Sequence, residues 1–335
     1  MMTLIRDVTS AIVHSADTLR SFQRYMTPCS VVILCLVFAR VVYPVFWPYV
    51  QETSLIHQIG SPGRISIDSI PSDCFPQAIS ECQLFRRVVR LNLSDMYVPT
   101  SVLQRLGKLR ELRVLSLHGA AFECLRLDQL ANSTSIERLD LGFTGVEDAD
   151  IRHLGGMKQL KGMVLTSTSI SDDAVRTICS LRALESLSLD GTKIGDEGIE
   201  HLSSLNNLQH LCVSESRITG KCAASIAKLR QLRWVECDST DADDRLIKAF
   251  SHLEQLETIS FRRTQVGDGA LEELAKSQTV RIIYADGTTV TDAGLEHVAR
   301  IEQLEAISLA GTRCSEKGRK ALRKKLPRCS VLPEP

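Results

Sequence analysis

The side chains in this sequence that are best suited to chemistry are clustered acids and scattered histidines. Asp238, Asp241, Asp243 and Asp244 lie close together, and carboxylate oxygens are the ligands that calcium prefers. A turn followed by a helix cap accounts for the same four residues equally well. The 8 histidines fall at scattered positions without the spacing of metal ligands, so we predict no metal site.

Motifs of catalysis and phosphate binding are missing from the sequence. It contains no HExxH, no GxSxG and no P-loop pattern of GxxxxGK followed by Ser or Thr. We therefore predict a protein without enzymatic activity and without a cofactor.

Composition excludes further classes of protein. The 335 residues carry 40 basic and 40 acidic side chains, which argues against nucleic-acid binding through bulk charge. With 44% hydrophobic and 5% aromatic residues, we expect a globular protein with an aliphatic core. The 11 cysteines form no CxxC pair, so neither a zinc ribbon nor a compact disulfide scaffold fits.

A repeat of 24 residues organises most of the chain. Ten units run from residue 88 to residue 327 without an insertion. The positions three, five and eighteen residues into each unit are apolar in all ten units. The units begin at Val88, Leu112, Ile136, Leu160, Leu184, Leu208, Leu232, Leu256, Val280 and Leu304.

Each unit predicts a strand, a turn and a helix. The LxxLxL pattern alternates at its end, which places two apolar columns on one face of a short strand. Glycine permits a positive φ in the turns Asp190-Gly191-Thr192, Asp286-Gly287-Thr288 and Ala310-Gly311-Thr312. Ser171, Thr219 and Thr291 are candidate helix caps. One unit cannot bury its apolar face alone, so the units must stack into an α/β solenoid with a concave parallel sheet and convex helices.

This pattern resembles the leucine-rich repeat proteins over residues 88–327. The Asp-Glu-Gly-Ile segment at 196–199 is similar to the ribonuclease-inhibitor-like and cysteine-containing types. In place of their turn Asn or Cys, eight units carry Thr or Ser, whose hydroxyls could bond to neighbouring backbone. Met96 and Ala120 break that column, so the first two units are degenerate. We expect residues 51–87 to cap the open edge, with 64–67 as a capping strand.

The N-terminal region predicts a membrane anchor. Residues 29–50 carry a single charge, that of Arg40, and a charged side chain is costly in lipid. Arg6, Arg20 and Arg24 precede this segment, so residues 1–28 are expected in the cytoplasm and the repeats outside it. A cleaved signal peptide is the alternative for this segment, although no typical cleavage site follows. Residues 328–335 are predicted to be a tail.

A membrane segment before threonine-type repeats is similar to bacterial membrane-anchored leucine-rich repeat proteins. The resemblance implies interaction with another macromolecule rather than chemistry. The alternative is a soluble intracellular adaptor that brings substrates to another protein such as a ubiquitin ligase, with residues 29–50 packed as a core helix. Such ligase adaptors carry an F-box, and residues 51–87 contain no convincing one.

The outward-facing strand residues of repeats six to nine form the candidate binding site. Aromatic side chains with arginines are typical of binding hot spots, although the β-propensity of Trp, Ile and Tyr accounts for part of the pattern. We predict a protein or peptide partner on this concave face, no nucleic acid, and a monomeric chain. The candidate residues are His210, Trp234, Ile282 and Tyr284, flanked by Glu236, Asp238, Arg262 and Arg263.

Overall fold

A computed structural model describes residues 65–67, 88–122 and 124–333 of the chain. The predicted N-terminal segment 1–28, the predicted span 29–50 and most of the predicted cap 51–87 lie outside these residues. Within the described part, no helix is both long enough and apolar enough to cross a bilayer.

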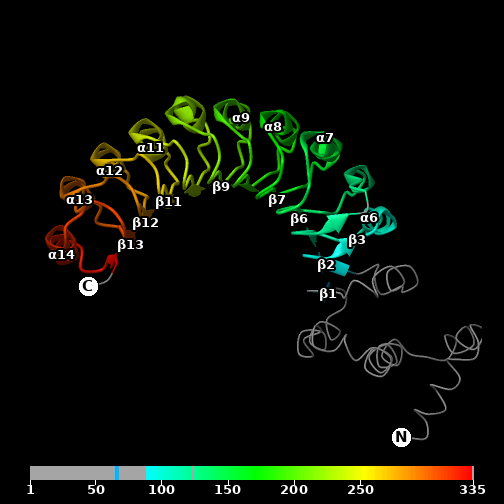
Figure 1. The fold of residues 1–335 in the computed structure, drawn as a ribbon, viewed down its shortest axis with the longest axis horizontal. Coiled ribbons are helices and arrows are strands. Elements are labelled where there is room, and N and C mark those ends of the chain that lie inside the picture. The colour runs from blue at the N-terminus through cyan, green and yellow to red at the C-terminus, as the bar shows by residue number, and fades with distance from the viewer. Residues whose placement is uncertain (1–64, 68–87, 123, 334–335) are drawn as a thin grey trace, which may run out of the picture. The chain divides into compact units, whose positions relative to one another are not determined.

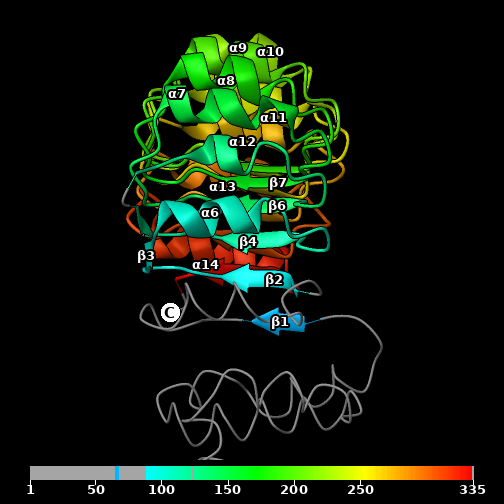
Figure 2. The same ribbon diagram turned by 90° about the vertical axis from the view of Figure 1, so that its right-hand side faces the viewer.

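The described repeats form the predicted curved stack, with strands on the inner side and helices on the outer side (Figure 1). In the described residues, twelve parallel strands follow one another in sequence order in a single sheet, and Figure 2 shows those nearest its N-terminal end side by side. The strands are β1 (Ile65–Ile67), β2 (Val88–Asn92), β4 (Val114–Ser116), β6 (Arg138–Asp140), β7 (Gly162–Val164), β8 (Ser186–Ser188), β9 (His210–Cys212), β10 (Trp234–Glu236), β11 (Thr258–Ser260), β12 (Ile282–Tyr284), β13 (Ala306–Ser308) and β14 (Ser330–Leu332).

The α-helices are short, and each described repeat except the second contains one. The second and third repeats deviate most from this pattern. The second has only a 3₁₀ turn, η3 (Leu127–Gln129), and in the third α7 continues as the 3₁₀ helix η4 (Arg152–Gly156). In the sixth repeat η5 (Gly220–Cys222) leads into α10. The α-helices are α6 (Thr100–Leu106), α7 (Asp148–Ile151), α8 (Asp172–Ile178), α9 (Asp196–Leu202), α10 (Ala223–Ile226), α11 (Asp244–Ser251), α12 (Asp268–Leu274), α13 (Asp292–Val298) and α14 (Glu316–Lys325).

The apolar columns predicted from the period form the core between the sheet and the helices. Leu187, Leu211 and Val235, on neighbouring strands, are fully buried or nearly so. Leu202 and Phe250, from the column eighteen residues into the unit, are buried behind them on the helices. Burial of aliphatic side chains from every unit is what stabilises the stack.

The turn after each strand adopts a left-handed conformation in all ten repeats. Gly191, Gly287 and Gly311 have φ of 65°, 70° and 69°, as their predicted role requires, and Gly119 shares it. Six repeats place another residue in the same conformation, which costs energy in residues with a side chain. Those residues are Asp95, Phe143, Ser167, Glu215, Ser239 and Arg263.

The hydroxyl column after the turn bonds to backbone within its own repeat. Thr192 Oγ1 donates to the Leu189 carbonyl at 2.6 Å, and Thr264 Oγ1 donates to Phe261 at 2.6 Å. These bonds fasten each turn to its strand rather than forming a ladder between repeats. The first two repeats, which lack the hydroxyl, instead pair β3 (Tyr97–Val98) with β5 (Ala121–Phe122).

Aspartates on the convex side connect consecutive repeats. The Asp268 carboxylate accepts from Thr291 N at 2.8 Å and from Thr291 Oγ1 at 2.6 Å, at the start of the next helix. Asp172 accepts from Gly195 N in the same way. A Cβ on Gly198 would lie 2.4 Å from Asp172 Oδ1, which explains the glycine in that helix start. The ladder comprises Asp148, Asp172, Asp196, Asp244, Asp268 and Asp292.

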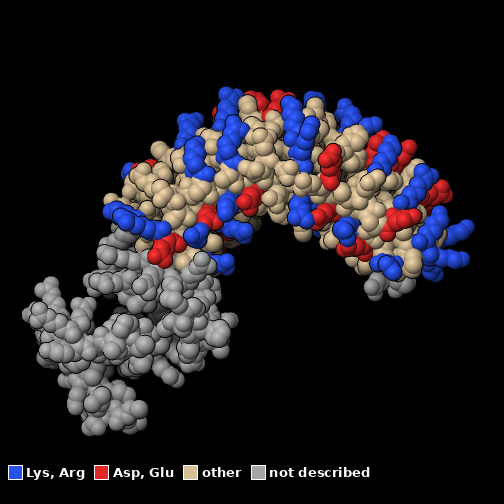
Figure 3. All heavy atoms as spheres, turned by 180° about the vertical axis from the view of Figure 1, so that it is seen from behind, with Lys and Arg blue, Asp and Glu red and all other residues tan. Residues whose placement is uncertain are grey.

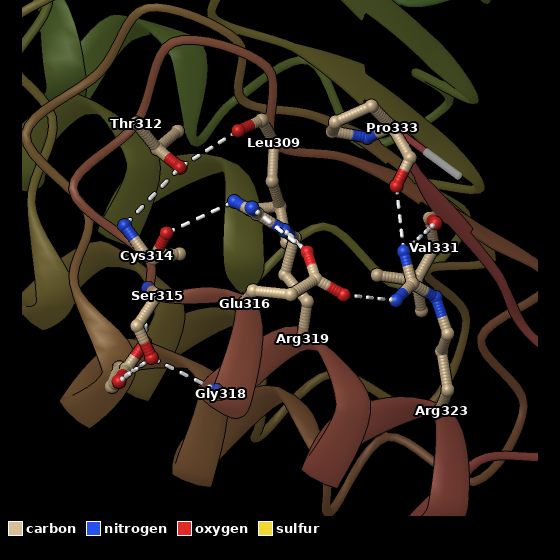
Figure 4. Close-up of polar contacts among 11 residues, drawn as sticks. Leu309, Thr312, Cys314, Ser315, Glu316, Gly318, Arg319, Arg323, Val331 and Pro333 are labelled. Atoms are coloured by element: carbon tan, nitrogen blue, oxygen red, sulfur yellow. Dashed lines mark hydrogen bonds and ion pairs between the residues drawn. The ribbon is translucent and has the colours of Figure 1, made fainter. Parts of the chain in front are cut away.

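The ends of the sheet differ from a plain cap and tail. At one end β1 pairs in parallel with β2, in the position predicted for the capping strand. At the other end the predicted tail contains a strand, because β14 pairs with β13 and continues the 24-residue period. Glu316 on α14 holds both Arg319 and Arg323, and Arg323 reaches the carbonyls of β14 and of Pro333 (Figure 4).

Candidate protein-binding surface

The predicted surface residues lie in two columns across neighbouring strands. His210 pairs in register with Trp234, which in turn pairs with Thr258. Ile282 follows next to Thr258. The second column contains Cys212, Glu236, Ser260 and Tyr284 in the same register.

Trp234 is the exposed aromatic side chain of this surface. Its exposed fraction is 39%, so the indole is accessible from the concave side. The indole Nε1 donates a hydrogen bond of 2.8 Å to Glu236 Oε1, two residues further along β10. This bond satisfies the one polar group of the indole and leaves the ring to contact other molecules.

Small side chains on β11 divide the predicted patch in two. Thr258 and Ser260 are 6% and 2% exposed, so they lie beneath the larger side chains of the strands on either side. His210 and Trp234 are exposed on one side of β11, whereas Ile282 and Tyr284 are half-buried on the other. The eight predicted residues therefore do not form one uniform surface.

Arg262 connects the two halves. Its Nη1 lies 3.7 Å from Asp238 Oδ2, and its Nε lies 3.1 Å from Asp286 Oδ2. The guanidinium carbon also lies 4.3 Å from the centroid of the Tyr284 ring, a cation–π contact. Asp286 was not among the predicted site residues, although it follows Asp238 after two complete repeats.

Arg263 does not share the strand face with the other predicted residues. It occupies the left-handed turn position with φ of 52° and is exposed. Its Nε donates to Ser239 Oγ at 2.8 Å, in the turn of the preceding repeat. Arg263 therefore lies on the rim next to the concave surface.

Three carboxylates surround a thiol on the acidic side of the surface. Burial, together with the negative charges of Asp190, Glu236 and Asp238, raises the pKa of Cys212 to about 12. The thiol consequently stays protonated at neutral pH and is a poor nucleophile. Burial also raises the pKa of Asp190. Sequence analysis missed Asp190, because its proximity to repeat seven depends on the curvature and register of the sheet.

Three of the four aspartates considered for calcium have partners in different places. Asp238 faces Arg262, whereas Asp243 accepts from Arg245 N and caps α11. Asp244 accepts from Gly267 N in the following repeat. Across the described ranges, no three His, Cys, Asp or Glu side chains are grouped as metal ligands would be.

Charges of both signs are interspersed over the repeats, and basic side chains gather around α14 at the C-terminal end (Figure 3). The residues just before the strands carry charges of opposite sign in neighbouring repeats and form ion pairs. Arg233 Nη2 lies 2.5 Å from Glu257 Oε1, and Arg281 Nη1 lies 2.6 Å from Glu305 Oε1. These pairs neutralise one another along the edge of the sheet. This edge of the sheet therefore contributes little net attraction for a charged partner.

Comparison with known proteins supports the fold that these observations define. The family model described as Leucine Rich repeat matches residues 180–203, the length of one unit. No curated protein matches the sequence. The register, the curved sheet and this match together give the chain the leucine-rich repeat fold, as predicted.

Two solved bacterial structures share this fold. An internalin (inlF) from Listeria monocytogenes is 21% identical, covers 73% of this chain and 74% of its own, and has a TM-score of 0.56. An internalin C2 from the same species is 22% identical, covers 65% of this chain and 91% of its own, and has a TM-score of 0.53. At this identity the likeness is one of fold. The cysteine-containing subtype stays a prediction.

Proposed function

We propose that this protein is a non-enzymatic, membrane-anchored scaffold that binds a protein or peptide through the concave face of repeats six to nine. The observation that carries the proposal is Trp234, a large aromatic side chain exposed on a concave strand. Aromatic anchors at the centre of a surface dominate the free energy of binding in many interfaces. Neighbouring His210 and Glu236 supply polar groups for orientation.

The dimensions of the surface fit an extended partner. Neighbouring strands lie roughly 4.8 Å apart, so the strands from β9 to β12 span about 14 Å. An extended peptide covers about 3.3 Å per residue, so four or five residues cross this surface. A rigid stack of repeats also holds the contact residues in place, which lowers the entropic cost of binding.

Selection of peptides tests the binding proposal. A phage-displayed random peptide library is panned on the full-length protein. The affinities of the selected peptides are then measured for the wild type, Trp234→Ala and Tyr97→Ala. Trp234→Ala is expected to weaken binding by about tenfold or more relative to wild type. Tyr97→Ala, which removes an aromatic side chain of 51% exposure from outside the concave columns, is the matched control. Equal affinity for the wild type and Trp234→Ala would contradict the proposal.

We propose the anchor on the basis of the sequence of residues 29–50 and the basic residues that precede them. Fractionation of cells followed by protease treatment of intact cells tests it, with an antibody against the C-terminus. Membrane-associated protein with repeats cleaved from outside supports the proposed topology. Soluble protein that is protected from protease would favour the intracellular adaptor instead.

A further inference from the structure

One position of the repeat alternates between aspartate and another residue along the acidic part of the surface. Just after β8 to β12 this position holds Asp190, Ser214, Asp238, Arg262 and Asp286. The hydrogen bond that the backbone makes to the aspartate is the same in these repeats. Each aspartate accepts from the backbone N–H of the next repeat, from Ser214 to Asp190 at 2.7 Å and from Arg262 to Asp238 at 2.8 Å.

Arg262 shows how a guanidinium fits between two of these aspartates. It makes ion pairs with Asp238 on one side and Asp286 on the other, at 3.7 and 3.1 Å. Tyr284 lies against the guanidinium. The sheet spacing therefore lets one planar cation bridge carboxylates that are two repeats apart.

The equivalent place two repeats earlier contains serine instead of arginine. Ser214 stands between Asp190 and Asp238, and its Oγ accepts a hydrogen bond of 3.1 Å from Asp238 N. No arginine or lysine in the described part of the chain forms an ion pair with Asp190. Glu236 occupies the position that corresponds to Tyr284, which adds a third carboxylate. This half of the surface therefore has excess negative charge beside the exposed Trp234.

The electrostatic environment of Asp190 agrees with a missing cation. Burial raises its pKa, and the nearby charge of Asp238 raises it further, against hydrogen bonds from Ser214 and Ser188 that lower it. A guanidinium between Asp190 and Asp238 would offset this repulsion.

We propose that the partner places an arginine side chain over Ser214, where it bridges Asp190 and Asp238 as Arg262 bridges Asp238 and Asp286. This inference rests on the proposed function and specifies the chemistry of the partner as an arginine-bearing extended peptide. Arginine fits better than lysine because its extended planar guanidinium can lie between two carboxylates and pair with both by charge, as Arg262 does, whereas an ammonium is a compact point charge. Glu236 and Trp234 border the same place and contact the residues next to the arginine.

Two variants test this placement in opposite ways. Ser214→Arg supplies the guanidinium from the protein itself and is expected to occupy the site. Asp190→Asn removes one of the two carboxylates without changing the size of the side chain. Gln255→Arg and Glu254→Gln make the same charge changes at exposed positions outside the concave surface, and serve as the controls.

The probes are fluorescein-labelled hexa-arginine, hexa-lysine and hexa-glutamate, titrated against the full-length protein by fluorescence anisotropy. Hexa-arginine is expected to bind the wild type most tightly of the three probes. Its affinity for Ser214→Arg and for Asp190→Asn should be lower than for the wild type by about tenfold or more. Ser214→Arg should also raise the melting temperature, which a disrupted fold would not do. Equal binding of hexa-arginine by the wild type and both variants would overturn the inference, as would equal affinity for hexa-lysine.

The outcome is separable from the test of the proposed function. If selected peptides depend on Trp234 but bind equally to Ser214→Arg and Asp190→Asn, the concave site stands and the arginine inference is wrong. If the peptides are also insensitive to Trp234→Ala, the proposed function fails as well.

Discussion

The guanidinium of Arg323 on α14 donates a hydrogen bond of 3.1 Å to the carbonyl of Val331 at the last strand of the sheet. Ser330 N and the Leu332 carbonyl bond to the β13 side. Because successive backbone groups of a strand point to opposite sides, the Val331 carbonyl faces the open edge. Arg323 also donates to Pro333 O, so one side chain occupies acceptors that another strand would otherwise use.

Loss of this contact should expose the edge. We expect Arg323→Gln to lower the free energy of unfolding by about 1 kcal/mol and to cause concentration-dependent self-association. Light scattering coupled to size-exclusion chromatography measures the association. Arg328→Gln, which removes an exposed arginine near the end of α14, should leave the mass unchanged. A monomeric Arg323→Gln at all concentrations would show that the edge is protected in another way.

The convex aspartate ladder makes stability depend on pH. Hydrogen bonds from Ser315 hold the pKa of Asp292 below its usual value. A depressed folded-state pKa stabilises the fold above the unfolded value near 3.8, and this contribution is lost as the pH falls through the folded pKa. Asp292→Asn should therefore be less stable than wild type at pH 7, and the difference should shrink below pH 4.

Chemical denaturation at a series of pH values measures this difference. Glu302→Gln removes an exposed carboxylate on the loop after α13 and is the control, because it should show no such convergence. A constant difference between Asp292→Asn and the wild type from pH 7 to pH 3 would contradict the role given to the ladder.

The left-handed turn predicts opposite effects for two glycines. Gly311 has φ of 69°, and an added Cβ would meet no atom closer than 3.7 Å. Gly311→Ala should therefore lose about 1 kcal/mol through backbone conformation alone. Gly145→Ala has open space and no positive φ, so its stability should be unchanged or slightly higher. Thermal unfolding of both variants measures the contrast, and equal losses would refute it.

The register of the strands predicts which concave and core residues matter for stability. Leu211→Ala removes a fully buried side chain of β9 and should cost about 2 to 5 kcal/mol. Trp234→Ala, on the adjacent strand but facing solvent, should leave the unfolding transition nearly unchanged. Denaturant titrations of both variants measure this, and a neutral Leu211→Ala would show that the register is wrong.

The 24-residue period was sufficient to predict the main-sheet strands of the ten units, the core and the helix of every unit except the second, because each unit repeats the same apolar columns. Three of the turn glycines were also predictable. The left-handed conformation of Phe143 and Arg263 was not, since the stack imposes it on residues that do not favour it. Strand β14 was predicted as part of the tail, although it lies 24 residues after β13. It was missed because it follows the last complete unit.

The binding surface was only partly predictable. Alternation at every other residue identified the outward-facing Trp234 and Glu236. The bridge of Arg262 between Asp238 and Asp286 depends on the direction of a long side chain, which no pattern in a single repeat specifies. The sequence shows that Asp190, Asp238 and Asp286 are spaced two repeats apart. Only the register of the sheet shows that one side chain can lie between two of them.

The most direct test of the central claim uses Trp234 as its own reporter. The chain has two tryptophans, so Trp47→Phe leaves Trp234 as the only indole. The full-length variant is titrated with a peptide selected on the wild-type protein while the tryptophan emission is recorded. A blue shift that saturates with the same affinity as binding is the predicted result, because the partner should cover the indole. Binding without any change in emission would contradict the claim that Trp234 lies in the interface.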